Sequence, residues 1–144
     1  MILHAGLIAL RLAGAWRGVL IEGPSGSGKS DLALRSISEG FRLVADDRVV
    51  TWTSGGRLFG RAPDSLTDLL EARGVGVVAE PTLVMAEVSL VARAGTSDRM
   101  PNSAYVEILG LRLPLLSLQL GDISAPMKLK RALCHFDGAF KKRI

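Results

Sequence analysis

The chain is poor in the residues that make disulfides, metal clusters and stacking surfaces: it has one cysteine, two histidines and 5% aromatic residues. The single cysteine, Cys134, excludes an intramolecular disulfide framework and a multi-cysteine zinc site. His4 and His135 stand at opposite ends of the sequence, so no histidine pair is available for a metal. No aromatic residues are interleaved with the basic clusters, as they are in proteins that bind single-stranded nucleic acid. No apolar run approaches the roughly 20 residues that span a bilayer. We therefore expect neither a nucleic-acid nor a membrane partner.

What is present is the composition of an ordinary globular domain. Hydrophobic residues make up 48% of the chain, the mean hydropathy is +0.30 and the formal net charge is +4. A chain of this length buries roughly two-thirds of its unfolded surface, which predicts one domain over residues 1–144. The apolar residues 1–10 lack the basic head of a signal peptide. We interpret them as a strand and expect a cytoplasmic protein.

Residues 23–30 read Gly-Pro-Ser-Gly-Ser-Gly-Lys-Ser, a complete phosphate-binding loop (P-loop). Its glycines let successive backbone N–H groups turn inward towards a phosphate, and the start of the following helix adds a positive field. Lys29 can reach the β- and γ-phosphate oxygens, and the Ser30 hydroxyl can ligate Mg²⁺. The motif predicts a nucleoside triphosphate bound by Gly23, Pro24, Ser25, Gly26, Ser27, Gly28, Lys29 and Ser30.

The pattern along the chain predicts an α/β P-loop domain with a mixed, strand-rich sheet. Two strands, at 3–12 and 18–22, precede the P-loop, and a helix ending near Gly40 follows it. A strand over 42–47 comes next, and then a hairpin whose turn is Ser54-Gly-Gly56. Pro63 is expected to open a helix that contains Leu66, Leu69 and Leu70. The remaining expected elements are strands around 83–91, 105–111 and 113–120 and a helix beginning at Pro126.

Two adjacent carboxylates, Asp46 and Asp47, follow the apolar residues Leu43-Val-Ala45. In P-loop proteins the end of such a strand tends to lie close to the bound Mg²⁺. Neighbouring strand residues point to opposite faces, so the two aspartates should have different roles unless the strand bends. One can hold the metal or its bound water, for which Asp46 is the candidate, and the other can accept a proton. The alternative is a strand-to-turn cap, where Asp is common.

A third polar segment reads Glu71-Ala-Arg-Gly-Val-Gly76. From composition alone it fits a phosphate or metal contact and a helix-terminus salt bridge equally well. The guanine-reading Asn-Lys-x-Asp pattern of GTPases is missing, because Asn102 is the only asparagine and Ser103 follows it. Three functions stay open at this point: a protein kinase, a small-molecule P-loop kinase, and a nucleotide-sensing regulator without useful turnover.

Taken in order, these pieces resemble the catalytic domain of bacterial HPr kinase/phosphorylase. The resemblance covers most of residues 4–131 and includes His4, the P-loop with Asp31 after it, and the segment 40–47. It continues through Gly60-Arg-Ala-Pro63 and the Glu-x-Arg-Gly-x-Gly segment at 71–76. It is closest to the short form of some Gram-negative bacteria, without the N-terminal domain of the long form.

The resemblance implies an ATP- and Mg²⁺-dependent serine kinase that acts on the phosphocarrier protein HPr and can also run the reverse phosphorolysis. It assigns Asp47 as proton acceptor, and as donor in reverse, with His4 and Lys29 completing the catalytic set. Ser30 and Glu71 would serve Mg²⁺, and Arg73 would support the substrate or phosphate. The family's Arg-Pro-Gly-Arg-Asn stretch becomes residues 128–132 here, of which only Arg131 is carried over, as a candidate for stabilising the transferred phosphate. A trimer or hexamer is the assembly that the resemblance implies.

Overall fold

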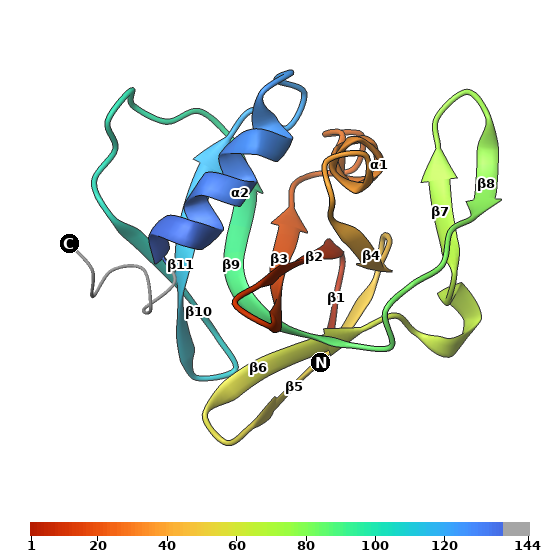
Figure 1. The fold of residues 1–144 in the computed structure, drawn as a ribbon, viewed down its shortest axis with the longest axis horizontal. Helices are drawn as coiled ribbons and strands as arrows, with labels where there is room; N and C mark the ends of the chain where they lie inside the picture. The colour runs from red at the N-terminus through yellow and green to blue at the C-terminus, as the bar shows by residue number, and fades with distance from the viewer. Residues whose placement is uncertain (137–144) are drawn as a thin grey trace.

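A nine-stranded mixed sheet forms the centre of the computed structural model, which describes residues 1–136 (Figure 1). Its main path runs in the order β1-β5-β6-β9-β3-β2-β4, and β11 pairs with the far part of β9 and carries β10 at its outer edge. A separate two-stranded sheet pairs β7 with β8. The strands are β1 (Ile2–Leu3), β2 (Gly6–Leu12), β3 (Ala15–Glu22), β4 (Arg42–Ala45), β5 (Val49–Ser54), β6 (Arg57–Arg61), β7 (Leu69–Ala72), β8 (Gly76–Ala79), β9 (Ala86–Ala94), β10 (Ala104–Ile108) and β11 (Leu111–Leu118). The helices are α1 (Lys29–Ile37), the short 3-10 helix η1 (Asp64–Leu66) and α2 (Ala125–Phe136).

Strand direction decides where the phosphate loop lies. β3 runs parallel to β9, and β9 runs parallel to β11, whereas all other named pairs in the main sheet are antiparallel. The carboxyl ends of β3, β9 and β11 therefore meet at one edge, where the P-loop follows β3. This is the edge at which open α/β sheets place ligands. The mixed, strand-rich α/β sheet predicted from the sequence is confirmed.

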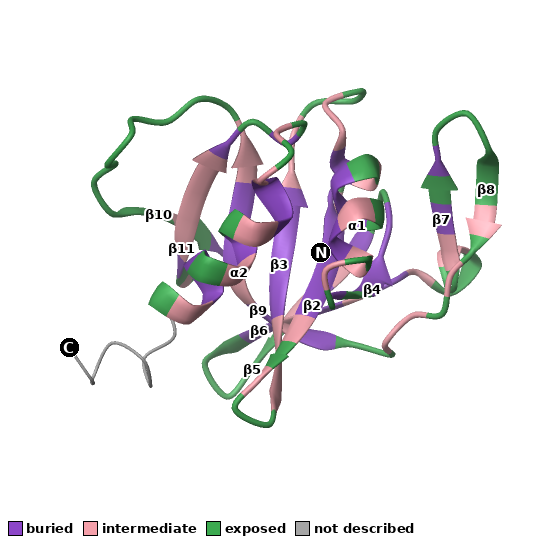
Figure 2. Cartoon of the chain, turned by 45° about the horizontal axis from the view of Figure 1, so that its top comes forward, coloured by how far each residue is buried: buried purple, intermediate pink, exposed green. Residues whose placement is uncertain are grey.

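Both faces of the main sheet are buried, which Figure 2 shows as purple along β2, β3 and β9. Alternation along β3 explains the arrangement: Val19 and Ile21 belong to the cluster under α1 and α2, and Leu20 belongs to the opposite cluster. The opposite cluster is closed by residues of the β5–β6 and β10–β11 hairpins, among them Leu58 and Leu113. No helix in residues 1–136 has the length and apolarity needed to cross a bilayer.

The helix expected from Pro63 through Leu70 is wrong. Only η1 forms, and the chain then turns at Asp68, whose φ is 61°, and enters β7. The carboxylate of Asp68 accepts hydrogen bonds from the backbone N–H (2.8 Å) and hydroxyl (2.6 Å) of Thr82. These bonds fix the base of the β7–β8 hairpin. Leu70 is buried and Glu71 is exposed, so this segment alternates as a strand does.

Other expected bounds shift by a few residues. The turn at Leu109 and Gly110, both with positive φ, divides the last two strands earlier than expected, and β9 begins at Ala86 rather than near 83. α1 ends at Ile37, and Gly40, with φ of 98°, donates its N–H to the Ile37 carbonyl. His4 lies in a bend between β1 and β2 and not within a strand.

Candidate active site

The phosphate-binding loop follows β3 and leads into α1 as the motif predicts. Gly28 has a φ of 98°, which only glycine adopts without strain, and its carbonyl accepts the first helical hydrogen bond from Leu32 N–H at 2.9 Å. Gly23 is tightly enclosed, because a Cβ there would collide with the Ser27 side chain and lie 2.9 Å from the Cβ of Ala94. The loop is therefore held in one narrow conformation at the N-terminus of α1.

Lys29 is buried beside the loop that it serves, with 9% of its surface exposed. Its Nζ donates to the carbonyls of Gly23 at 2.8 Å and Pro24 at 3.1 Å. An ammonium group has three donors, so these two bonds orient the group and leave a third N–H for a phosphate oxygen. The positive charge is fixed at the loop.

The aspartate pair divides into a buried member and an exposed one. Asp46 is 8% exposed and accepts hydrogen bonds from the Ser30 hydroxyl at 2.7 Å and from Glu71 N–H at 2.9 Å. It thereby joins the P-loop to β7. The Asp47 side chain is 53% exposed, and its Oδ1 lies 2.7 Å from His4 Nε2.

A backbone turn separates the two carboxylates. β4 ends at Ala45, and Asp47 has a φ of 66° while Arg48 N–H donates to the Asp46 carbonyl at 2.7 Å. The Asp47 carbonyl in turn accepts from Ala5 N–H at 3.1 Å, which ties the turn to the bend that carries His4. The different surroundings that strand alternation predicted are present, but the turn after the strand contributes to them.

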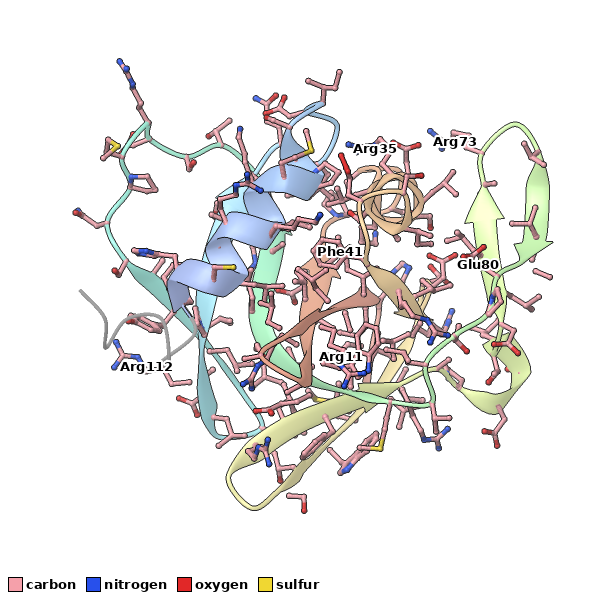
Figure 3. The ribbon with its side chains drawn as sticks, in the orientation of Figure 1. Arg11, Arg35, Phe41, Arg73, Glu80 and Arg112 are labelled. Atoms are coloured by element: carbon pink, nitrogen blue, oxygen red, sulfur yellow. The ribbon has the colours of Figure 1, made fainter. Side chains whose placement is uncertain are left out.

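These segments surround one pocket of about 120 Å³. It receives residues from the bend before β2, the P-loop, the turn after β4 and the β7–β8 hairpin, whose upper end carries Arg73 in Figure 3. The lining residues are His4, Ser25, Gly26, Gly28, Lys29, Ser30, Asp31, Asp47, Glu71 and Arg73. Asp46 lies beneath this pocket as the link between Ser30 and Glu71.

One predicted residue lies elsewhere. Arg131 is on α2, where it lines a different hollow together with residues of β2. Its assignment to the transferred phosphate stays a prediction. The segment 71–76 forms a β-hairpin turn rather than a helix terminus, so that alternative explanation of its charges is wrong.

Sequence reasoning missed the loop that follows β11. Leu120 lies beside Gly28 of the P-loop, with its Cβ 4.0 Å from the place of a Cβ on that glycine. The guanidinium of Arg35 on α1 donates to the carbonyls of Leu120 and, at 3.0 Å, Asp122, and also pairs with Asp31 at 2.9 Å. The four-residue spacing of Asp31 and Arg35 predicts an ion pair on a helix, but no sequence signal predicts contacts to backbone carbonyls.

The oxygen donors present suit a magnesium ion that arrives with a nucleotide. Ser30 Oγ and the backbone N–H of Glu71 are both hydrogen-bonded to Asp46, and Ser30, Glu71 and Asp47 line the same pocket. Within residues 1–136, no group of three or more His, Cys, Asp or Glu side chains could hold a metal ion unaided. Mg²⁺ usually keeps several waters and binds through one or two carboxylates plus substrate phosphates. The donor set fits that mode.

Comparison with known proteins agrees with this geometry. The family model described as the HPr Serine kinase C-terminal domain matches residues 3–84. The chain is 39% identical over 117 residues to an HPr kinase/phosphorylase of Cupriavidus necator, covering 72% of this chain and 36% of that protein. It is 55% identical over 62 residues to one of Brevibacillus brevis, covering 42% of this chain and 20% of that protein. The chain thus spans about a third or less of these relatives' length.

A solved structure extends the likeness to the whole fold. The HPr(Ser) kinase/phosphatase from Coxiella burnetii superposes with a TM-score of 0.78 at 24% sequence identity, covering 100% of this chain and 99% of that one. The two share an overall fold, including the region beyond residue 84 that the family model leaves unmatched. On the match over residues 3–84, the chain belongs to the HPr serine kinase C-terminal domain family.

Proposed function

We propose that this protein is an ATP- and Mg²⁺-dependent protein serine kinase whose acceptor is the phosphocarrier HPr or a homologue. The observation that carries the proposal is the division between Asp46 and Asp47. One carboxylate is buried and hydrogen-bonded to Ser30 of the P-loop and to the backbone N–H of Glu71, and the other is exposed in the pocket beside His4. A nucleotide sensor needs a metal ligand but no exposed base, so this division favours a transferase.

Nucleotide binding would rest on the loop amides and on Lys29, whose charge the loop carbonyls already orient. Ser30, Asp46 and Glu71 would hold Mg²⁺, which neutralises phosphate charge when bound. Because the Ser30 hydroxyl donates a hydrogen bond to Asp46, the lone pairs of the Ser30 oxygen are free to face a cation. Asp46 thus orients Ser30.

Asp47 would accept the proton of the acceptor serine. As that proton moves to the carboxylate, the serine oxygen forms a bond to the γ-phosphorus, and the bond between this phosphorus and the β,γ-bridging oxygen breaks to release ADP. His4 Nε2, 2.7 Å from Asp47 Oδ1, holds the carboxylate in place and leaves Oδ2 for the serine. Arg48 lies farther from that second oxygen, at 3.7 Å.

The same groups would serve phosphorolysis, in which inorganic phosphate takes the place of ADP as the group that accepts the phosphoryl from serine. A protonated Asp47 would return its proton to the serine oxygen as an oxygen of inorganic phosphate forms a bond to the phosphoserine phosphorus. The bond between that phosphorus and the serine oxygen breaks, and the products are free serine and pyrophosphate. We place both reactions in the cytoplasm and propose the trimer or hexamer that the family resemblance implies.

The direct test is to incubate the protein with labelled ATP, Mg²⁺ and HPr and to look for acid-stable phosphate on serine. Label on HPr that disappears in the Asp47→Asn protein supports the kinase. Tight ATP binding with no label on HPr indicates the nucleotide sensor instead. Label that appears on a small molecule but not on HPr indicates the small-molecule kinase.

A further inference from the structure

A second hollow, of about 380 Å³, lies between the end of β2 and the outer half of α2. We call it the basic groove, and it is lined by Leu10, Arg11, Leu12, Lys130, Arg131 and Cys134. Its three cations come from two elements far apart in sequence. Figure 3 shows Arg11 well below the upper edge of the molecule, where Arg35 and Arg73 lie. The basic groove is therefore distinct from the phosphate pocket.

Among the described residues, the cations of the basic groove have no acidic partner. Within residues 1–136, Arg11, Lys130 and Arg131 form no ion pair, although most other surface cations do. Examples of paired cations are Arg57 with Glu87, Arg93 with Glu22, and Lys128 with Asp122. Three like charges around one hollow repel each other, and an acidic ligand would relieve that repulsion.

The floor of the basic groove is apolar. Leu10 and Leu12 pack against the main core but remain partly exposed, and Cys134 is also partly exposed between the cations. A cationic rim around an apolar floor matches an acidic protein surface with an apolar side chain at its centre. Up to residue 136, no aromatic side chain lines the groove to stack on a nucleic-acid base.

The position of α2 brings the basic groove within reach of a protein bound at the phosphate pocket. The loop before α2 touches the P-loop through Leu120, and Arg35 holds that loop by the carbonyl of Asp122. α2 begins at Ala125, and at a rise of 1.5 Å per residue Arg131 lies roughly 9 Å farther along the helix axis. A small protein domain is about 30 Å across, so one acceptor can cover both places.

We propose that the basic groove docks an acidic surface of the acceptor protein, away from the serine that receives the phosphate. This inference rests on the proposed kinase function. Docking remote from the reacting atoms strengthens binding equally in the ground and transition states, so its loss raises KM and leaves kcat unchanged. It also makes association with the acceptor depend on salt.

The test uses Arg11→Glu and Lys130→Glu, singly and together, with Arg112→Glu as the matched control. Arg112 carries the same charge, sits on β11 over the ring of Tyr105 at 3.9 Å, and lies outside the basic groove. We expect the double variant to raise the KM for HPr about 10-fold or more, with kcat and ATP affinity within two-fold of the parent. The control should match the parent, and a double variant with the control's KM would overturn the proposal.

Direct binding separates this proposal from the kinase function. Calorimetric titration of HPr into the parent and the double variant requires no turnover. If the parent transfers no phosphate but binds HPr more tightly than the double variant does, the docking surface stands and the kinase function falls. Equal binding by the two proteins refutes the docking surface whether or not phosphate is transferred. A third outcome also refutes the docking surface. If the double variant loses binding of a single-stranded oligonucleotide and binds HPr as the parent does, the groove is a nucleic-acid site.

Discussion

Replacing Asp47 by Asn separates catalysis from nucleotide binding. The Asp47 side chain is 53% exposed, and its only side-chain hydrogen bond in residues 1–136 is the 2.7 Å bond from His4 Nε2, which an amide oxygen can also accept; Arg48 lies 3.7 Å from its other oxygen. The substitution keeps the size and removes the proton acceptor. Transfer to serine should fall about 10²–10⁴-fold, the usual contribution of a general base, which corresponds to about 3–5 kcal/mol of activation free energy. ATP affinity should stay within a few-fold.

Asp46→Asn is the matched control, because it makes the same chemical change at a buried site. One oxygen of Asp46 accepts from Ser30 Oγ and the other from Glu71 N–H, so an amide –NH₂ faces either the Glu71 N–H, which is also a donor, or Ser30 Oγ, whose hydroxyl proton must then turn away and lose its partner. Leaving a buried donor unpaired costs about 1–3 kcal/mol. This variant should lose stability and require more Mg²⁺, whereas Asp47→Asn should unfold at the parent's urea concentration. Single-turnover transfer, ATP titration and urea unfolding, measured on both proteins, separate loss of the base from loss of stability. An Asp47→Asn protein that transfers phosphate at the parent rate refutes the assignment of Asp47 as the base.

Three further changes test the rest of the site. Lys29→Ala should abolish transfer and weaken ATP binding, since the loop loses its only fixed point charge; unchanged turnover at saturating ATP would contradict this. Arg35→Ala should raise the KM for ATP by releasing residues 119–124 from the P-loop, with partial rescue by Arg35→Lys; kinetics identical to the parent's would make these contacts irrelevant to the site. Thr82 lowers the pKa of Asp68 by side-chain and backbone hydrogen bonds, so this link is complete above about pH 4 and is lost as pH falls through the depressed pKa. In that acidic range the hydrogen-exchange protection factors across the β7–β8 hairpin should fall in the parent, and Asp68→Asn should lack that pH dependence.

The parts of the site that local rules govern could be predicted from the sequence. The P-loop is a contiguous motif whose glycines set the backbone, and Asp46 and Asp47 follow a short apolar strand, so their place at one edge of a sheet follows from strand direction. The hairpin around Ser54-Gly-Gly56 has a turn signal of its own and was also predicted correctly. Each of these features needs only residues that are neighbours in sequence.

The parts that depend on distant contacts could not be predicted. Leu66, Leu69 and Leu70 have helical spacing, but Asp68 is held at positive φ by Thr82, 14 residues later. Arg131 was assigned to the transferred phosphate by matching a short stretch of sequence to the family pattern. In the structure, the segment that lies beside the P-loop is the loop before α2. No local pattern in either segment records its tertiary partner.

Asp46 explains why the Glu71–Gly76 segment belongs to the same site as the P-loop. Its carboxylate is fixed from one side by the backbone N–H of Glu71, and it fixes the Ser30 hydroxyl from the other. A displacement of β7 would therefore rotate the Asp46 carboxylate and redirect the lone pairs of Ser30. Within the described residues, the hairpin's outer strand β8 pairs only with β7 and exposes Val77, while Leu70 of β7 is buried in the main core. The position of the hairpin on the domain is therefore held by the burial of Leu70, the Asp68 link at its base and the Asp46 bond near its tip, so that a change at either polar link should reach Ser30 without touching the nucleotide.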